Sequence, residues 1–291
     1  MREDPEVPVF RCGYCLVQYI EPHFTDLKDY YVSEYREQHS EAPGAPESAE
    51  DRYQAQAYKM KRSAEAIKGF IPEGGNILEI GCSAGGLLAH LENSYELYGA
   101  EWNEEDAAFV REAGIPVESG DISEVYPGKT FTGIVAIQVI EHQPDPVGFL
   151  RQIKERLIGG GYLYMETPNV DDALLSQYDI PEFADFWYRQ PHITYWNAHS
   201  MASLLTWLGF EARIDWVQRY GLATHMNWLQ GRGPMKDLYA ARKYMKPVDP
   251  KKRSASALNR VWTKLDHEYR VQLRTLYACD TITVKARLRQ I

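Results

Sequence analysis

The chain has 291 residues, of which 44% are hydrophobic, and it carries a formal net charge of −9 at pH 7. This size predicts one large domain, or one domain with an accessory lobe, around a sizeable core. The negative charge argues against a nucleic-acid substrate, because no run of Lys or Arg is longer than the three residues at 251–253.

Cysteine content and hydropathy indicate the cellular compartment of the protein. Four cysteines in 291 residues are too few for a disulfide scaffold. No apolar segment approaches the roughly 20 residues that a membrane span needs, and the first residues lack the apolar core of a signal peptide. We therefore expect a cytoplasmic protein that does not bind membranes.

The first recognisable pattern, close to the N-terminus, is Cys12-x-x-Cys15. Such a pair can supply half of a structural zinc site, which is almost always four-coordinate. Cys82 and Cys279 lie in other parts of the predicted fold, and His23 would add only a third ligand. We therefore expect a small hairpin that folds without metal.

Three segments lie between this pair and the first strand of the main sheet. Residues 24–36 carry a run of tyrosines, with Tyr31 and Tyr35 on one face of an expected helix or turn. Residues 38–51 are rich in Glu, Ala, Pro and Ser without periodicity, which predicts a linker or lid. Residues 51–70 have apolar side chains at helical spacing, so we expect an amphipathic helix there.

The stretch 76–88 passes from an apolar run into a glycine-rich turn, and a helix then begins near Gly86. Gly81 and Gly85 allow the backbone to approach a ligand where a Cβ atom would clash. The amides at the start of the helix suit a negative or polar group. Taken alone, the same pattern also fits an ordinary strand–turn–helix corner.

Two acidic residues follow the glycine turn at regular intervals. Glu101 comes twenty positions after Gly81, at the end of the next apolar run, and a carboxylate there can accept both hydroxyls of a ribose. Asp121 comes twenty positions later, after a third apolar run, where a carboxylate can meet an adenine amino group. The turn and the two acids together predict a nucleoside-binding site at the ends of successive strands.

From residue 77 onward, strand patterns alternate with helical patterns. The expected strands are 77–80, 96–100, 116–118, 133–138, 161–167, 211–218 and 280–288. This alternation predicts a doubly wound parallel sheet. Helices are expected at 199–208, ending at Gly209, and at 255–276. The segment 220–278 is too long for a hairpin loop, so we expect a helical insertion.

The sequence resembles the class I S-adenosylmethionine-dependent methyltransferases. The stretches that carry the resemblance are LEIGCSAG at 78–85, VIEHQPDP at 139–146, LIGGGYL at 157–163, PHITYW at 191–196 and LGFE at 208–211. In pattern the chain is most similar to the small-molecule methyltransferases of quinone, sugar and natural-product pathways. Many of these carry an N-terminal zinc lobe, which the single cysteine pair makes degenerate here.

The resemblance implies a fold and a domain organisation. The expected fold is α/β, with a Rossmann-like sheet of seven mostly parallel strands and an antiparallel last strand. A small N-terminal lobe and lid linker occupy 1–50, and the methyltransferase domain occupies 51–291. The insertion at 220–278 either caps the substrate pocket or forms a homodimer contact, and the sequence does not separate the two.

The resemblance also implies the cofactor, S-adenosylmethionine, and the residues that hold it. These are Glu79, Gly81, Cys82, Ser83, Gly85, Glu101, Trp102, Asp121, Ile122 and Gln138. In ubiquinone-type relatives a Glu-x-x-Glu-His run can hold a divalent metal. Gln138 replaces the first Glu here, which leaves Glu141 and His142, whereas hard divalent ions favour several oxygen ligands. We therefore expect no metal.

Methyl transfer requires that acceptor, methyl group and sulfur lie in line. An oxygen acceptor must also lose a proton, and a histidine with a pKa near neutral suits that duty. The candidates are His142, His192 and Tyr195. A purely structural role is an alternative for both histidines. His142 would then support the loop at a strand tip, and His192 would support a lid.

The resulting hypothesis is an enzyme that methylates a small polar metabolite, such as a sugar, a sugar nucleotide or a natural-product intermediate. Its expected partner is that small molecule, with no nucleic acid and no membrane. One alternative is a nicotinamide-dependent oxidoreductase, which is disfavoured because Gly81-x-x-x-Gly85-Gly86 lacks the Gly-x-Gly-x-x-Gly spacing. The other is a non-catalytic protein that binds S-adenosylmethionine.

Overall fold

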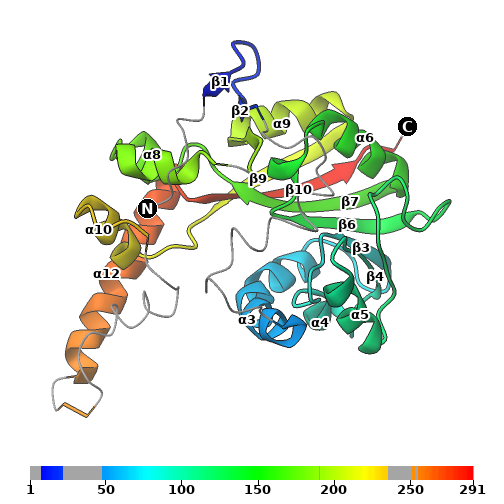
Figure 1. Ribbon diagram of the computed structural model, residues 1–291, viewed down its shortest axis with the longest axis horizontal. Coiled ribbons are helices and arrows are strands. Elements are labelled where there is room, and N and C mark those ends of the chain that lie inside the picture. Colours follow the sequence, from blue (N-terminus) through cyan, green and yellow to red (C-terminus); the bar gives the residue numbers. More distant parts are fainter. Residues whose placement is uncertain (1–7, 22–47, 190, 235–250, 253–254, 291) are drawn as a thin grey trace. The chain divides into compact units, whose positions relative to one another are not determined.

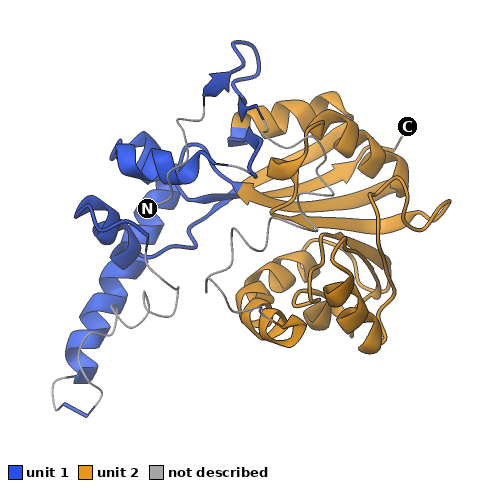
Figure 2. Cartoon of the chain, viewed as in Figure 1, with its two compact units in different colours: residues 1–21, 168–198, 215–282 blue, residues 22–167, 199–214, 283–291 orange. Residues whose placement is uncertain are grey.

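The computed structural model describes residues 8–21, 48–189, 191–234, 251–252 and 255–290. The chain forms two compact units, which Figure 2 shows in different colours. The sheet unit comprises Pro22–Thr167, His199–Ile214 and Thr283–Ile291. The accessory unit comprises Met1–Glu21, Pro168–Ala198 and Asp215–Ile282.

A seven-stranded sheet forms the sheet unit, with strand order β5-β4-β3-β6-β7-β10-β9. The strands are β3 (Asn76–Ile80), β4 (Glu96–Ala100), β5 (Val117–Glu118), β6 (Phe131–Ile137), β7 (Leu157–Pro168), β9 (Phe210–Val217) and β10 (Thr281–Leu288). Strands β5 to β7 pair in parallel, and the arrow of β10 points the other way in Figure 1. The predicted fold class, including the antiparallel last strand, is confirmed.

Burial explains why these segments are strands. Ile77 and Leu78 in β3, and Ile134 and Val135 in β6, have no solvent exposure, as expected for parallel strands covered on both faces. Strand β7 begins at Leu157, four residues before the expected start. The extra residues are paired because Phe131 lies opposite Leu157, beyond an irregularity in the register.

Helices cover the two faces of the sheet unit. One face carries α3 (Ala49–Lys68), α4 (Leu88–Leu91) and α5 (Glu104–Glu112), and the other carries α6 (Pro146–Arg156) and α9 (Ala198–Trp207), as Figure 1 shows. Ser48 and Asp51 form a capping box that begins α3. Gly209, with φ of +93°, follows the end of α9, as expected for a glycine after a helix C-terminus.

The accessory unit is built from segments that lie far apart in the sequence. Its elements are β1 (Val9–Arg11), β2 (Gln18–Ile20), α7 (Ala173–Ser176), α8 (Pro181–Trp187), β8 (Thr194–Tyr195), α10 (Leu222–Leu229) and α12 (Ala255–Thr275). The expected hairpin forms between β1 and β2, and β8 adds a third strand beside β2. Sequence analysis missed β8, because a two-residue strand has no periodicity to detect.

Several expectations concern residues outside those described. These are His23, the tyrosine segment at 24–36 with Tyr31 and Tyr35, and most of the linker at 38–51. The domain boundary expected at residue 50 and the metal-free state of Cys12 and Cys15 stay predictions. Among the helices that the structure describes, none is both long enough and apolar enough to cross a membrane.

Candidate functional site

A cavity of about 300 Å³ opens in the sheet unit at the carboxyl ends of β3, β4 and β6. Seven of the predicted cofactor residues line it: Gly81, Ser83, Glu101, Trp102, Asp121, Ile122 and Gln138. Parallel strands present their carboxyl ends at one edge of the sheet, and ligands of open α/β sheets bind there. The structure therefore gathers most of the predicted site around one cavity.

The other three predicted residues lie behind the cavity wall. Glu79 and Cys82 are buried. A Cβ atom at Gly99 would lie 2.7 Å from the Cys82 sulfur, so Cys82 packs closely beneath β4. Gly85 has φ of +79°, and a Cβ atom there would lie 2.8 Å from Val110. Cys82 and Gly85 therefore shape the turn without lining the cavity.

The glycine turn is fixed against the next strand. The amides of Gly81 and Cys82 both donate to the Ala100 carbonyl, at 2.8 and 3.2 Å. Gly81 has φ of +70°, and a Cβ atom there would lie 3.1 Å from a methyl group of Val139. Glycine is required at this position because the backbone is left-handed and the space is closed.

The Glu101 carboxylate is oriented by two backbone amides. Its Oε2 accepts from the Ser83 amide and its Oε1 from the Asn103 amide, both at 2.8 Å. An ionised carboxylate has about four acceptor sites, so each oxygen keeps capacity for a further donor. Glu101 is thus pre-positioned to accept two hydroxyl groups of a ligand in the cavity.

A buried ion pair ties two helices to the glycine turn. Asp106 on α5 accepts from Arg52 Nε on α3 at 2.8 Å and from the Ser83 hydroxyl at 2.9 Å. Burial alone would lower the pKa of Arg52, but its hydrogen bonds to Asp106 and Glu105 raise it. Sequence analysis missed this pair, because nothing in a single sequence links positions 52 and 106.

Glu79 is an acid in an apolar setting. Burial, and then the negative charge of Glu101, raise the pKa of Glu79 well above its usual value. Within the described residues its Oε2 has no hydrogen-bond partner. Burial, together with Glu79 and Glu101, also raises the pKa of Cys82, which excludes that thiol as a nucleophile near neutral pH. A ligand cation near Glu79 would favour its charged form.

Gln138 combines backbone strain with a buried donor. Its φ of +56° is left-handed, which costs a residue other than glycine about 1–3 kcal/mol. Its amide donates to the Glu166 carbonyl at 2.7 Å, and its side-chain Nε2 is buried with no partner among the described residues. A buried donor without an acceptor at a cavity wall is suited to a ligand oxygen.

These groups fit S-adenosylmethionine. Glu101 offers acceptors to a ribose, Asp121 lies at the cavity wall beyond β5, and Gln138 offers a donor to a carboxylate. Glu79 provides a buried acid that an ammonium group would stabilise in its ionised form. The cavity is therefore compatible with both the nucleoside and the amino-acid part of that molecule.

Of the three catalytic candidates, His142 lines this cavity. It closes the 3₁₀ helix η2 (Ile140–His142) and is 8% exposed. Its Nε2 lies 4.0 Å from Glu141 Oε1, and Glu141 Oε2 accepts from the Thr167 hydroxyl at 3.0 Å. His142 therefore lies beside a buried carboxylate, at the tip of β6.

His192 and Tyr195 belong to the accessory unit. The Tyr195 hydroxyl accepts from the Arg189 amide at 3.0 Å and lies 3.3 Å from the Arg189 carbonyl, so it fixes the loop that precedes β8. The ring of His192 lies 6.2 Å from that of Tyr195. The structure brings these two residues together, and their part in catalysis stays a prediction.

Sequence analysis also missed several residues that line the cavity, among them three from outside the predicted strand ends. Gln56 comes from α3, Gln143 follows η2, and Phe149 comes from α6. Gln143 lies within the resembling stretch at 139–146, which was a usable signal. Gln56 lies on α3, well before the glycine turn in the sequence. Only the packing of α3 against the sheet brings this side chain to the cavity.

Comparisons with known proteins agree with this geometry. A family described as a methyltransferase domain matches residues 51–213, more than half of the chain. The chain is 26% identical over 212 residues to a fatty-acid O-methyltransferase of Mycolicibacterium smegmatis, which covers 67% of this chain and 72% of that protein. It is 24% identical over 157 residues to a tRNA U34 carboxymethyltransferase of Alteromonas mediterranea, which covers 48% of this chain and 46% of that protein.

A solved structure is similar in fold. It is described as a SAM-dependent methyltransferase from Archaeoglobus fulgidus, and it superimposes with a TM-score of 0.51 at 17% identity. The match covers 81% of this chain and 94% of that one. At this identity the similarity supports the arrangement of strands and helices only. The reaction must be argued from the residues of the site.

The buried ion pair behind the cavity should stabilise the fold. We expect Asp106→Asn to lower the free energy of unfolding by about 3 kcal/mol, because the part-buried Arg52 would lose its buried charged partner and keep the exposed Glu105. Glu105→Gln is the matched control, since Glu105 also pairs with Arg52 but its side chain is 57% exposed, against 0% for Asp106. Urea denaturation should show a control loss below about 1 kcal/mol. Equal losses in the two variants would contradict this assignment.

Proposed function

The chain belongs to the methyltransferase-domain family and uses S-adenosylmethionine as its cofactor, and on that premise we propose that it methylates a small polar metabolite. The observation that carries the proposal is the single cavity that joins Glu101, Asp121 and Gln138 to His142. The first three suit a nucleoside with an amino-acid tail, and His142 is a proton acceptor at the same wall.

We assign each wall of the cavity to one part of the cofactor. Glu101 accepts the two ribose hydroxyls, and Asp121 accepts from the adenine amino group. Gln138 donates to the carboxylate of the methionine part, which supplies the acceptor that its buried Nε2 lacks among the described residues. Glu79 does not line the cavity, but its negative charge just behind the wall would attract the ammonium group of that part, which would offset the cost of burying that charge.

The protein's part in the reaction is mainly positional. The sulfonium group of the bound cofactor supplies an electrophilic methyl group. The residues of the cavity would hold the acceptor atom in line with that methyl group, and alignment of this kind supplies much of the rate of a two-substrate reaction. When the acceptor is a hydroxyl, His142 takes its proton, and the Glu141 carboxylate, 4.0 Å from Nε2, stabilises the resulting imidazolium.

The proposed acceptor class rests on the net charge of the chain and on what its relatives modify. A net charge of −9 disfavours a polyanionic acceptor such as tRNA, which one relative modifies. The other relative methylates a fatty acid, so an acceptor with a carboxyl group is the principal competitor of a sugar or a natural-product intermediate. Cytoplasmic location and freedom from membranes and nucleic acids are part of the same proposal.

Two measurements test the proposed function. S-adenosylhomocysteine should raise the melting temperature of the protein by mass action, whereas NAD should leave it unchanged. Transfer of a labelled methyl group from S-adenosylmethionine should then be measured with sugars and sugar nucleotides, with fatty acids and with tRNA. Stabilisation by NAD alone would refute the cofactor, and transfer only to fatty acids or tRNA would refute the acceptor class.

The ribose assignment predicts the effect of Glu101→Gln. We expect the affinity for S-adenosylhomocysteine to fall by about tenfold or more, because one charged acceptor is lost at a buried hydroxyl pair. Glu104→Gln is the matched control, since Glu104 is exposed on α5 and pairs with Arg111. Calorimetric titration should show little change in the control. Unaltered affinity in the Glu101 variant would place the ribose elsewhere.

The raised pKa of Glu79 predicts a pH-dependent affinity. An acid whose pKa is higher in the folded protein than in the unfolded chain contributes to stability at low pH. This contribution to stability is lost as the pH rises through the pKa of the folded state. Binding of an ammonium group needs the ionised form, so the ligand releases a proton. We therefore expect the affinity for S-adenosylhomocysteine to rise with pH across the titration of Glu79.

Two controls isolate this effect. The Glu79→Gln variant should bind S-adenosylhomocysteine more weakly, with an affinity that no longer follows the titration of residue 79. The wild-type protein should bind 5′-methylthioadenosine, which lacks the ammonium group, without that pH dependence. If both ligands showed the same pH profile, the pairing of Glu79 with the ammonium group would be wrong.

A further inference from the structure

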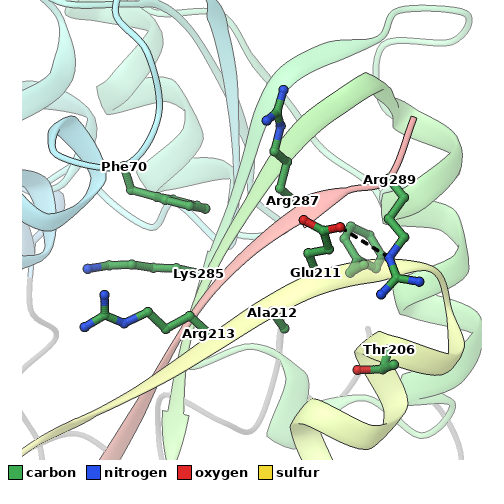
Figure 3. A pocket seen from close by; sticks show the side chains of 9 residues that line it. Phe70, Thr206, Glu211, Ala212, Arg213, Lys285, Arg287 and Arg289 are labelled. Carbon is green, nitrogen blue, oxygen red and sulfur yellow. Dashed lines mark ion pairs between the residues drawn. The ribbon is translucent and has the colours of Figure 1, made fainter. Parts of the chain in front are cut away.

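A second cavity, of about 480 Å³, lies on the sheet unit away from the cofactor residues, and Figure 3 shows it from close by. Strands β9 and β10 form its floor, and Phe70, just beyond α3, forms a wall. It shares no lining residue with the cofactor cavity. It is therefore a separate feature of the same unit.

Cations dominate this second cavity. Among the described residues, its lining includes Arg213, Lys285, Arg287 and Arg289, against the single carboxylate of Glu211. The whole chain has 41 acidic residues and 32 Lys or Arg residues, so acidic residues are in excess. In the lining of this cavity the balance is reversed, with four cations beside one acid. A concave surface lined by one sign of charge raises the local concentration of ions of the opposite sign.

The register of the two strands explains how the cations meet. The Arg289 amide donates to the Gly209 carbonyl at 3.2 Å, at the start of the antiparallel pairing of β9 with β10. Continuing this register places Arg213 directly opposite Lys285, and Figure 3 shows the two side chains lying side by side. Like charges directly opposite each other weaken a strand pair. Such a conflict is typical of a functional surface.

The remaining cations are held at the edges. Arg287 Nε donates to the Gly160 carbonyl at 3.1 Å, and its guanidinium lies 5.5 Å from the centre of the Tyr162 ring. Arg289 pairs with Glu211 at 3.6 Å, as the dashed line in Figure 3 shows. The charge of Arg289 is thus partly offset. Arg213 and Lys285 line the same cavity beside these two cations.

From the opposed Arg213–Lys285 pair inside a cavity, we infer a binding site for a small multivalent phosphate, such as tripolyphosphate or the phosphate tail of a larger metabolite. Alternate residues of an antiparallel strand lie about 7 Å apart, so these cations suit a ligand with several separated charges. Guanidinium groups bind phosphate through paired hydrogen bonds.

The inference is tested by calorimetric titration of the full-length chain with tripolyphosphate at low ionic strength. Saturating S-adenosylhomocysteine is present, so that the cofactor cavity is filled. We expect binding in the wild-type protein and about tenfold weaker binding in the double variant Arg213→Gln, Lys285→Gln, because two charged donors are lost. Higher salt should also weaken binding in the wild-type protein.

Two further variants keep the test decisive. Lys59→Gln with Lys61→Gln removes the same charge from exposed positions on α3 and should leave the affinity nearly unchanged. Glu211→Gln removes the carboxylate that lines the cavity in the described part of the chain, and it should tighten binding by about twofold or more. Gain of affinity cannot arise from a damaged fold.

Three outcomes would overturn the inference. Equal weakening in the two double variants would show a general charge effect, and competition between tripolyphosphate and S-adenosylhomocysteine would place the phosphate in the cofactor cavity. Binding of a single-stranded oligonucleotide without any binding of tripolyphosphate would make the surface a nucleic-acid interface. Because the cofactor residues are untouched, this result is independent of the acceptor proposed above.

Discussion

Three acidic side chains surround the glycine turn, and the site depends on how each is stabilised. Asp106 is buried and neutralised by Arg52. Glu101 is held by the amides of Ser83 and Asn103. Glu79 has neither kind of support at its Oε2 within the described residues, so its pKa rises. The first two acids fix the shape of the turn, and the third is the one that we propose changes its charge when a ligand binds.

Helix α3 holds this arrangement at both ends. Near its start, Arg52 bonds to Asp106 behind the glycine turn. Near its end, Ser63 donates to Glu166 Oε1 at 2.6 Å, and the carbonyl of Glu166 accepts from the strained Gln138. Strained backbone persists only where the surroundings over-determine it. The helix that begins the domain therefore maintains the two most constrained parts of the cofactor cavity.

The two halves of the sheet differ in how they meet solvent, and their cavities lie in different places accordingly. Strands β3 and β6 are covered on both faces, so their only accessible parts are the ends, where the cofactor cavity lies. Strand β10 alternates buried Val284 and Ala286 with the cations at 285 and 287. Antiparallel strands can leave one face to solvent, and here that face carries the second cavity.

Local sequence patterns were sufficient to predict the strands of the main sheet and the position of the first cavity. The period of apolar residues predicted every strand of the main sheet to within a few residues, because buried strands read as short apolar runs. The glycine turn and the spacing to Glu101 and Asp121 predicted a common cavity, because parallel strands end at one edge. The resemblance to a family added the methyl donor, which spacing alone did not identify.

Tertiary structure decided what depends on distant contacts. The Arg52–Asp106 pair, the buried donor of Gln138 and the opposition of Arg213 to Lys285 each join or constrain residues that no local pattern relates. The accessory unit likewise combines three separate segments, with β8 pairing to β2 near the N-terminus. Periodicity determines which face of an element is apolar. Only packing determines which partner that face meets, because many partners satisfy the same pattern.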